Sequence, residues 1–308
     1  MSGLKIIRKR IASVKNTQKI TKAMKMVAAA RLRRAQQHIL ELRPYARETA
    51  AVLRSVAARA GGAEAHPLLA RREEKKVLLV VLTSDRGLAG AFNASINKAA
   101  HTLYKKLQAE GKEVSVAAIG RKGRDYFRRR EVNIKHEFRD VFENLTVSKA
   151  NKIGRTLMKS YAPSFDPENV GRLNDENDFH LEADLDAVYL IYNEFKSAIS
   201  QQVTIEALLP VCPDTEGDED NEIDFIYEPS KKALLDRLID LHVRTQIYRA
   251  LIESVASEHG ARMTAMDNAS RNASDMISKL TLQFNRARQA AITKELMEII
   301  GGAEALKS

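Results

Sequence analysis

The first sixty residues carry one continuous helical pattern. Apolar side chains recur at steps of three and four residues, as on one face of an α-helix. They are Leu4, Ile7, Ile11, Val14, Ile20, Met24, Val27, Ala35, Ile39 and Leu42. Pro44 is the one helix breaker before Gly61-Gly62, and we expect it to kink the helix. The pattern therefore predicts a helix over residues 3–58, in an N-terminal helical segment 1–60.

The last eighty residues repeat this periodicity. Apolar or small side chains lie at Leu234, Leu238, Leu241, Tyr248, Ile252, Val255, Met266, Ala269, Ala273, Ile277, Leu280, Phe284, Ala287 and Ala291. Ser230 suits an N-cap, and Gly301-Gly302 should end a helix over 230–301. Two such long helices bury their apolar stripes best against each other, so we expect a long antiparallel coiled coil. Its many Ala, Met, Gln and Thr side chains predict a thin seam.

The middle of the chain changes to an alternation of strands and helices. Residues 77–82 form a continuous apolar run, as in a strand buried on both faces. A polar turn over 83–90 leads into a helix of about 91–110. Further strands are expected at Val114–Ile119, Val132–Phe138, Ala187–Phe195 and Gln202–Leu208, with helices at Arg121–Arg130 and Thr146–Tyr161. The alternation predicts a mostly parallel, Rossmann-like α/β domain over 75–210, joined to the last helix by an acidic loop over 211–229.

Composition supports this architecture. Among 308 residues there are only 14 glycines and 7 prolines, as long helices require, and 44% of residues are hydrophobic, enough for a core. The single cysteine, Cys212, excludes a disulfide scaffold and a regulatory cysteine pair. The longest strong apolar run, residues 77–82, is too short to cross a bilayer.

The net charge of +10 is concentrated in one segment. Residues 1–43 hold twelve Lys or Arg and one acid, Glu41, which gives +11 there and −1 over the rest. Such a segment binds nucleic acid, an anionic membrane or an acidic protein surface. Because no aromatic residue precedes Tyr45 and the opposite stripe is apolar, nucleic-acid binding by a coiled coil is the second hypothesis.

Candidate catalytic chemistry is weak. The turn over 83–90 follows a strand and opens a helix, the setting of an anion site, but it lacks the Lys-Ser/Thr ending of a P-loop. We expect an ordinary turn capped by Ser84 or Asp85, and keep a small α/β enzyme as the third hypothesis. The seven histidines are scattered and predict no metal site. The sequence indicates neither a cofactor nor a catalytic residue.

Four stretches, in order along the whole chain, have long and specific sequences. They are Ile11–Ala29, Thr83–Asn93, Ala256–Met266 and Ala287–Ile299. Together they resemble the gamma subunit of bacterial F-type ATP synthase. The resemblance implies the same order of long helix, α/β domain and long helix.

The resemblance implies a central rotor shaft that performs no bond chemistry. The paired terminal helices would stand inside a ring of alternating alpha and beta subunits. The α/β domain would form part of a foot beside the epsilon subunit and the c-ring. Proton flow would turn this assembly and drive the beta subunits through the states that make ATP. The chain would lie peripherally on the cytoplasmic face of the bacterial inner membrane, without inserting into it.

Residue roles follow where the motifs match. Arg288 and Gln289 lie in the family's stretch that hydrogen-bonds a catch loop of the ring, and Thr293 and Glu295 share that surface. The resemblance places three N-terminal residues against an acidic lever segment on beta: Lys22, Met24 and Lys25. It places Tyr227 and Glu228 near the c-ring and epsilon. The acidic stretch 174–186 departs from the short bacterial pattern and has no assigned role.

Overall fold

The computed structural model describes residues 2–59, 66–163, 184–197, 200–212 and 230–305. It divides into two compact units. One consists of residues 1–29 and 262–308, and the other spans 30–261. The two longest helices, α1 (Ser2–Arg59) and α5 (Lys231–Ala305), contribute residues to both units.

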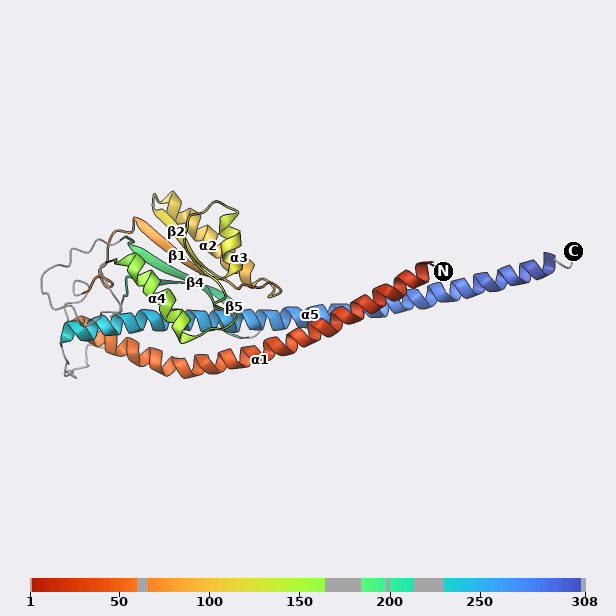
Figure 1. The fold of residues 1–308 in the computed structure, drawn as a ribbon, viewed down its shortest axis with the longest axis horizontal. Helices are drawn as coiled ribbons and strands as arrows, with labels where there is room; N and C mark the ends of the chain where they lie inside the picture. Colours follow the sequence, from red (N-terminus) through yellow and green to blue (C-terminus); the bar gives the residue numbers. More distant parts are fainter. Residues whose placement is uncertain (1, 60–65, 164–183, 198–199, 213–229, 306–308) are drawn as a thin grey trace. The chain divides into compact units, whose positions relative to one another are not determined.

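The larger unit is built on a five-stranded sheet (Figure 1). Its strands are β1 (Lys76–Leu82), β2 (Glu113–Ile119), β3 (Ile134–Phe138), β4 (Ala187–Phe195) and β5 (Gln201–Leu209). The spatial order is β3-β2-β1-β4-β5. The first four strands are parallel, with Leu82 beside Ile119, and β5 pairs antiparallel to β4. This confirms the Rossmann-like domain, in which β1 lies at the centre and is buried on both faces.

Helices cover both faces of this sheet. They are α2 (Phe92–Ala109), α3 (Arg121–Arg128), α4 (Val147–Tyr161) and the part of α5 within the unit. In Figure 1, α2 and α3 lie on one face, and α4 and α5 on the other. Gly154 of α4 lets the two helices approach, because a Cβ there would be 3.0 Å from Cγ of Arg244. The core runs without a break from the sheet into α1, through Leu53, Val56 and Ala57.

The ends of the long helices test the expected start and stop signals. The hydroxyl of Ser230 accepts a hydrogen bond from the N–H of Ala233 (3.2 Å), which confirms its N-cap role. At the other end, α5 passes through Gly301-Gly302 to Ala305, so the expected stop is wrong. Glycine in a helix costs only about 1 kcal/mol per residue, which is too little to end this one. Likewise α1 contains Pro44 without ending there.

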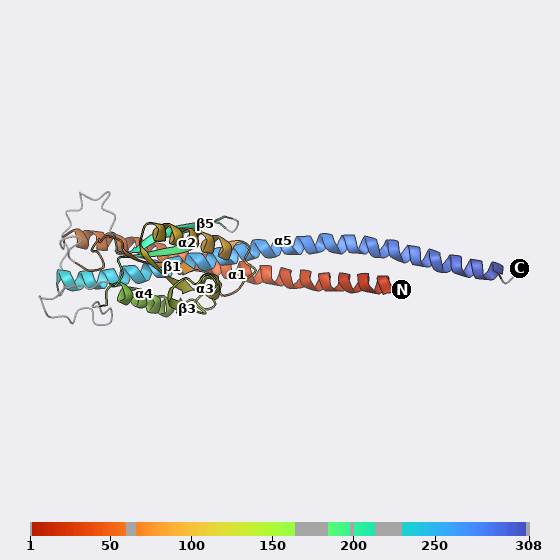
Figure 2. The same ribbon diagram turned by 90° about the horizontal axis from the view of Figure 1, so that it is seen from above.

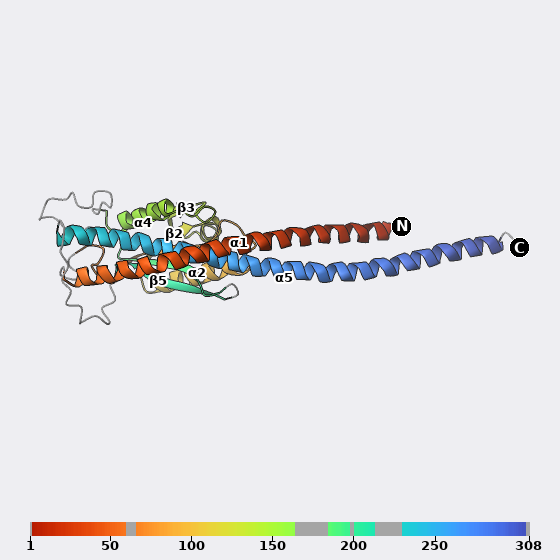
Figure 3. The same cartoon turned by 90° about the horizontal axis from the view of Figure 1, so that it is seen from below.

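The smaller unit is an antiparallel helix pair. Residues 3–29 of α1 run antiparallel to the facing part of α5, and Figures 2 and 3 show that α5 continues beyond the N-terminal end of α1. An ion pair between Lys25 and Asp267 joins the two helices. The expected antiparallel coiled coil is therefore confirmed. The acidic loop is described only over 211–212, and Gly61-Gly62 and most of the stretch 174–186 lie outside the described residues.

Candidate interaction surface of the terminal helices

The seam of the helix pair follows a strict three-four alternation along α1. Its half-buried or buried positions are Leu4, Ile7, Ile11, Val14, Gln18, Thr21, Lys25 and Ala28. The same alternation continues through Leu32, Ala35 and Ile39. Ile20 and Val27, which the apolar pattern placed on the buried face, are instead 60% and 54% exposed. The seven-residue repeat explains this difference, because counting in sevens from Ile7 reaches Val14, Thr21 and Ala28 and passes over Ile20 and Val27.

The facing stretch of α5 mixes small and large apolar side chains. Met266 and Ala273 are its most buried seam positions, at 5% and 7% exposed. Ala269, Ile277, Leu280, Phe284 and Ala287 are half-buried. With Thr21 and Ala28 as the buried positions of α1 in this unit, the pair fully buries few large apolar groups, and the larger ones are only half-buried. Since burial stabilises by about 25 cal/mol per Å² of apolar surface, this seam holds the helices together weakly.

Asp267 forms ion pairs with Lys25 and Arg271 at the seam, and Lys25 is one of the predicted contact residues. The Nζ of Lys25 donates to Asp267, and Nη2 of Arg271 donates to the other carboxylate oxygen of Asp267 at 2.6 Å. The hydrogen bonds from Lys25 and Arg271 lower the pKa of Asp267. Lys25 is therefore part of the pair's own structure as well as of its surface. Met24 beside it is half-buried, and Lys22 is exposed.

The remaining cations of this stretch of α1 have no counter-charge within the described part of the chain. They are Lys5, Arg8, Lys9, Arg10, Lys15, Lys19 and Lys22. Residues 1–29 contain no Asp or Glu. This helix surface therefore presents seven unpaired positive charges, and a complementary partner surface would be acidic.

Large apolar side chains are also exposed on this unit. On α1 they are Ile6, Ile20, Met26 and Val27, and on α5 they are Met276, Leu282, Ile292, Leu296, Met297, Ile299 and Ile300. Several are more than half exposed, up to 69% for Ile299. Contiguous exposed apolar surface marks interaction sites in soluble proteins. The apolar pattern along the chain did not single out these residues as a group, although their positions outside the seven-residue repeat are visible in the sequence.

The predicted contact residues of α5 belong to the same exposed stretch. Arg288, Gln289, Thr293 and Glu295 are all exposed. Neither Arg288 nor Glu295 forms an ion pair with another described residue. A free guanidinium and a free carboxylate on one helix are available to an outside partner. Tyr227 and Glu228, the other predicted pair, lie outside the described residues.

The turn after β1 is closed by its own side chains. The N–H of Gly123, in the first turn of α3, donates to Oγ1 of Thr83 at 2.7 Å, and the N–H of Arg121 donates to Oδ1 of Asp85 at 3.1 Å. These are the amides that an anion at this helix terminus would use. Asp85 thus caps α3 rather than the helix directly after the turn, where capping was expected. The geometry gives no support to the third hypothesis, an enzyme site here.

The described residues contain neither a metal-binding cluster nor a membrane-spanning helix. No group of His, Cys, Asp and Glu there could hold a metal ion. None of the described helices is both long and apolar enough to span a bilayer.

Comparison with known proteins gives a consistent result over the full chain. A family model described as ATP synthase matches residues 3–306. The ATP synthase gamma chain of Geobacter sp. (strain M21) is 49% identical over 307 residues, covering 100% of both chains. A chain in the central stalk and c-ring structure of Tetrahymena thermophila mitochondrial ATP synthase is 26% identical, with a TM-score of 0.57, over 82% of this chain and 99% of that one. A chain from Euglena gracilis mitochondrial ATP synthase shares the fold at 20% identity, with a TM-score of 0.63, over 99% of this chain and 95% of that one.

Proposed function

The chain belongs to the family of ATP synthase gamma chains, and we propose that it is the central shaft of a rotary ATP synthase. In this role the antiparallel helix pair stands inside a ring of alternating alpha and beta subunits. The Rossmann-like unit forms part of the foot, beside the epsilon subunit and the membrane c-ring. Proton flow turns c-ring, foot and shaft together. The turning shaft then biases each beta subunit through successive conformations of its nucleotide site.

The surface of the helix pair carries this proposal. Large apolar side chains such as Leu296, Met297 and Ile299 stay exposed, although the described chain holds other apolar groups buried. Leaving them in water costs about 0.8 kcal/mol per CH₂ group, which a surrounding protein ring would recover. The exposed arrangement therefore suits a helix enclosed by partner subunits.

The unpaired cations supply the second element of the mechanism. Lys15, Lys19 and Lys22 carry no counter-charge from the described chain, and an acidic lever segment on beta would meet them in turn as the shaft rotates. Exposed ion pairs are worth only about 0–1 kcal/mol each. Such contacts guide the partner without locking it, which a turning shaft requires.

Catalysis lies with the neighbouring subunits in this proposal. The chain contributes no catalytic residue, and ATP is bound and made on the ring. Through the foot the complex stays attached to the cytoplasmic face of the bacterial inner membrane, and this chain remains peripheral.

Reconstitution tests the shaft role directly. The full chain is mixed with alpha and beta subunits of a bacterial ATP synthase, and the purified product is assayed for ATP hydrolysis. We expect a complex of three alpha, three beta and one copy of this chain that is more active than alpha and beta alone. Failure to form an ATPase-active complex would refute the proposal.

The α5 contacts are tested by single substitutions in that complex. Arg288→Ala and Gln289→Ala should each lower ATP turnover, because each removes the side chain that would hydrogen-bond the catch loop of the ring. Asn285→Ala is the matched control, since Asn285 is also exposed and lies less than one turn away. Circular dichroism of each variant checks the fold. Unchanged turnover in both variants would exclude these two residues from coupling.

A further inference from the structure

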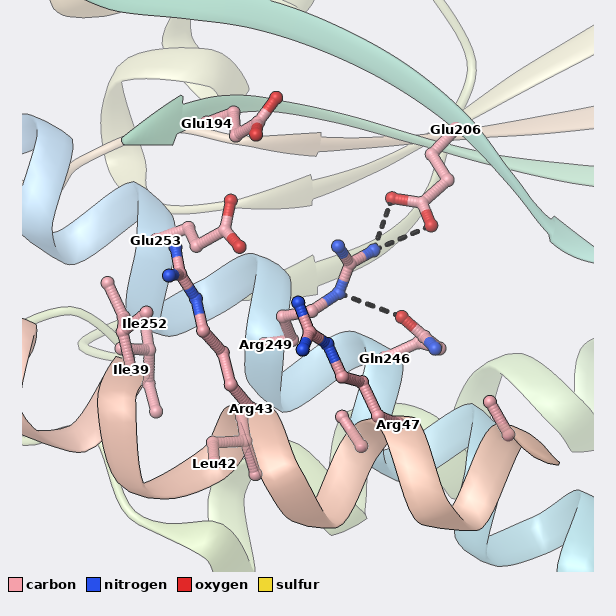
Figure 4. A pocket seen from close by; sticks show the side chains of 12 residues that line it. Ile39, Leu42, Arg43, Arg47, Glu194, Glu206, Gln246, Arg249, Ile252 and Glu253 are labelled. Carbon is pink, nitrogen blue, oxygen red and sulfur yellow. Dashed lines mark hydrogen bonds and ion pairs between the residues drawn. The ribbon is translucent and has the colours of Figure 1, made fainter. Parts of the chain in front are cut away.

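The larger unit contains a pocket that the shaft function does not use. It has a volume of about 540 Å³ and opens between α1, α5 and the hairpin of β4 and β5 (Figure 4). This volume lies in the range of small-molecule sites, about 300–1,000 Å³. Residues from four elements, far apart in sequence, line it.

One wall of the pocket is polar, and Arg249, Glu206 and Gln246 in this wall form hydrogen bonds with one another. The Nη2 of Arg249 donates to both carboxylate oxygens of Glu206, at 2.6 Å each, and its Nε donates to Oε1 of Gln246 at 2.8 Å. Figure 4 shows this group spanning from α5 to the strand. Because Arg249 and Glu206 neutralise each other, neither supplies a free charge to a ligand.

Glu253, one turn further along α5, has a carboxyl group with an unsatisfied oxygen. It is only 8% exposed, and its Oε2 is buried without a hydrogen-bond partner in the described chain. Desolvation raises the pKa of Glu253, which favours a neutral carboxyl group, while nearby Arg249 works against this shift. A buried polar atom without a partner costs about 1–3 kcal/mol. Glu253 also lines the pocket, so a ligand bound there would lie beside a carboxyl group whose hydrogen bonds are incomplete.

Two free cations stand opposite Glu253 on α1. Arg43 and Arg47 are exposed, one helical turn apart, and form no ion pair within the described ranges. Both reach from α1 toward α5 in Figure 4. Two guanidinium groups at this spacing can hold a phosphate or carboxylate through several charge-assisted hydrogen bonds.

The other wall of the pocket is apolar. It consists of Ile39, Leu42, Ala46, Ala50 and Ile252. An anion such as inorganic phosphate would leave this wall wet. Ile39 and Ile252 are already buried, but Leu42, Ala46 and Ala50 are half-buried, and a ligand with an apolar body would cover their exposed surface and gain the corresponding burial energy.

We propose that this pocket binds a small amphiphilic anion. Its phosphate or carboxylate head lies between Arg43 and Arg47 and hydrogen-bonds the carboxyl group of Glu253. Its apolar body packs on Leu42, Ala46 and Ala50. The inference rests on the pocket alone and stands whether or not the chain acts as a shaft.

Direct binding to the full chain tests the proposal. Hexyl phosphate, hexanoate and inorganic phosphate are titrated separately by isothermal calorimetry. At least one of the two alkyl anions should bind once per chain, and at least tenfold more tightly than inorganic phosphate. The tighter of the two identifies the head group. Absence of saturable binding by both alkyl anions, or equal affinity for inorganic phosphate, would overturn the proposal.

Three variants locate the binding. Arg43→Gln with Arg47→Gln should weaken it at least tenfold, whereas Arg33→Gln with Arg34→Gln, two exposed arginines earlier on α1, should leave it unchanged. Ala46→Phe keeps both arginines but fills the pocket, and should also weaken binding at least tenfold. Circular dichroism confirms that each variant is folded. Equal loss in both arginine pairs would indicate general attraction to a basic helix, and full binding by Ala46→Phe would place the ligand elsewhere; either result overturns the proposal.

Discussion

Gly120 joins the end of β2 to the start of α3, where the backbone passes close to that of Thr83. Its φ is +88°, a conformation that L side chains rarely adopt. A Cβ at this position would lie 2.0 Å from the carbonyl oxygen of Thr83, far inside van der Waals contact. The turn after β1 can therefore close only if this residue has no side chain.

Replacing Gly120 by alanine should destabilise the chain strongly. We expect Gly120→Ala to lower the free energy of unfolding by about 2–4 kcal/mol, because both the backbone conformation and the contact with Thr83 become strained. Urea unfolding followed by circular dichroism measures the change. Gly87→Ala is the control, since the nearest atom there, Cε of Lys122, is 3.9 Å away. Equal stability of Gly120→Ala and the wild type would show that the turn relaxes freely.

His242 links stability to pH. Burial, with a smaller contribution from Arg249, lowers its pKa from 6.5 to about 4. Between these values the unfolded chain binds a proton that the folded chain does not, so this group's contribution falls as the pH falls from 7 toward 4. At 1.36 kcal/mol per pKa unit, its total is at most about 3 kcal/mol.

The measurement compares urea unfolding of the wild type and His242→Gln at several values between pH 7 and pH 4. The variant should lose less stability than the wild type over this range, whatever its stability at pH 7. His38→Gln removes an exposed histidine of α1 and should keep the wild-type slope. Parallel curves for wild type and His242→Gln would contradict the assignment.

At the scale of elements, the most buried positions in the seam of the helix pair are mostly small residues. Ala28 is 1% exposed, yet Ile20 and Val27 on the same helix face solvent. A long seam of leucines would bind more strongly, but small residues let the helices lie close with little apolar burial. The weak seam and the exposed apolar surface are consistent with a helix pair that gains stability from surrounding subunits.

Enlarging a seam residue tests this packing. Ala28→Leu should destabilise the chain by about 1–3 kcal/mol, because the closely packed position has no room for the added atoms. Ala23→Leu places the same side chain at an exposed position of α1 and should change stability little. Thermal unfolding of the full chain, followed by helical ellipticity, compares the two. A stabilised Ala28→Leu variant would mean that the seam has space for leucine.

At the scale of the whole molecule, charge is divided unequally along the chain. The +11 of residues 1–43 is offset by only −1 over all the others. Most of the cations in residues 1–29 stay without a counter-charge from the described chain, so the charge is available to a partner.

Reversing part of that charge tests its role in the complex. Lys15→Glu, Lys19→Glu and Lys22→Glu together should reduce ATP turnover of the reconstituted complex by roughly tenfold, because acidic partner surfaces are then repelled. Lowering the salt concentration should deepen the loss. The triple Lys→Arg variant keeps the charge and should retain activity. If the Glu variant turned over ATP at the wild-type rate at every salt concentration, electrostatic guidance by this stripe would be excluded.

The sequence by itself determined the elements and their order. Helix periodicity, the buried run of β1 and the cap at Ser230 are local signals, and each was confirmed because neighbouring residues along the chain suffice to specify them. The family motifs also lie in short stretches. The family motif singled out Arg288 and Gln289; the structure shows that both are exposed, and their contact role stays a prediction.

Only the tertiary structure decided which side chains those elements bury. In the structure Thr21 and Ala28 are buried and Ile20 and Val27 are exposed, because α5 packs against only one face of α1. The tertiary structure also brought Arg43, Glu206 and Glu253 together from α1, β5 and α5 and left one carboxyl oxygen unpaired. The exact phase of burial and the pairing of charges depend on groups distant in sequence, which hydrophobic periodicity along one helix does not specify.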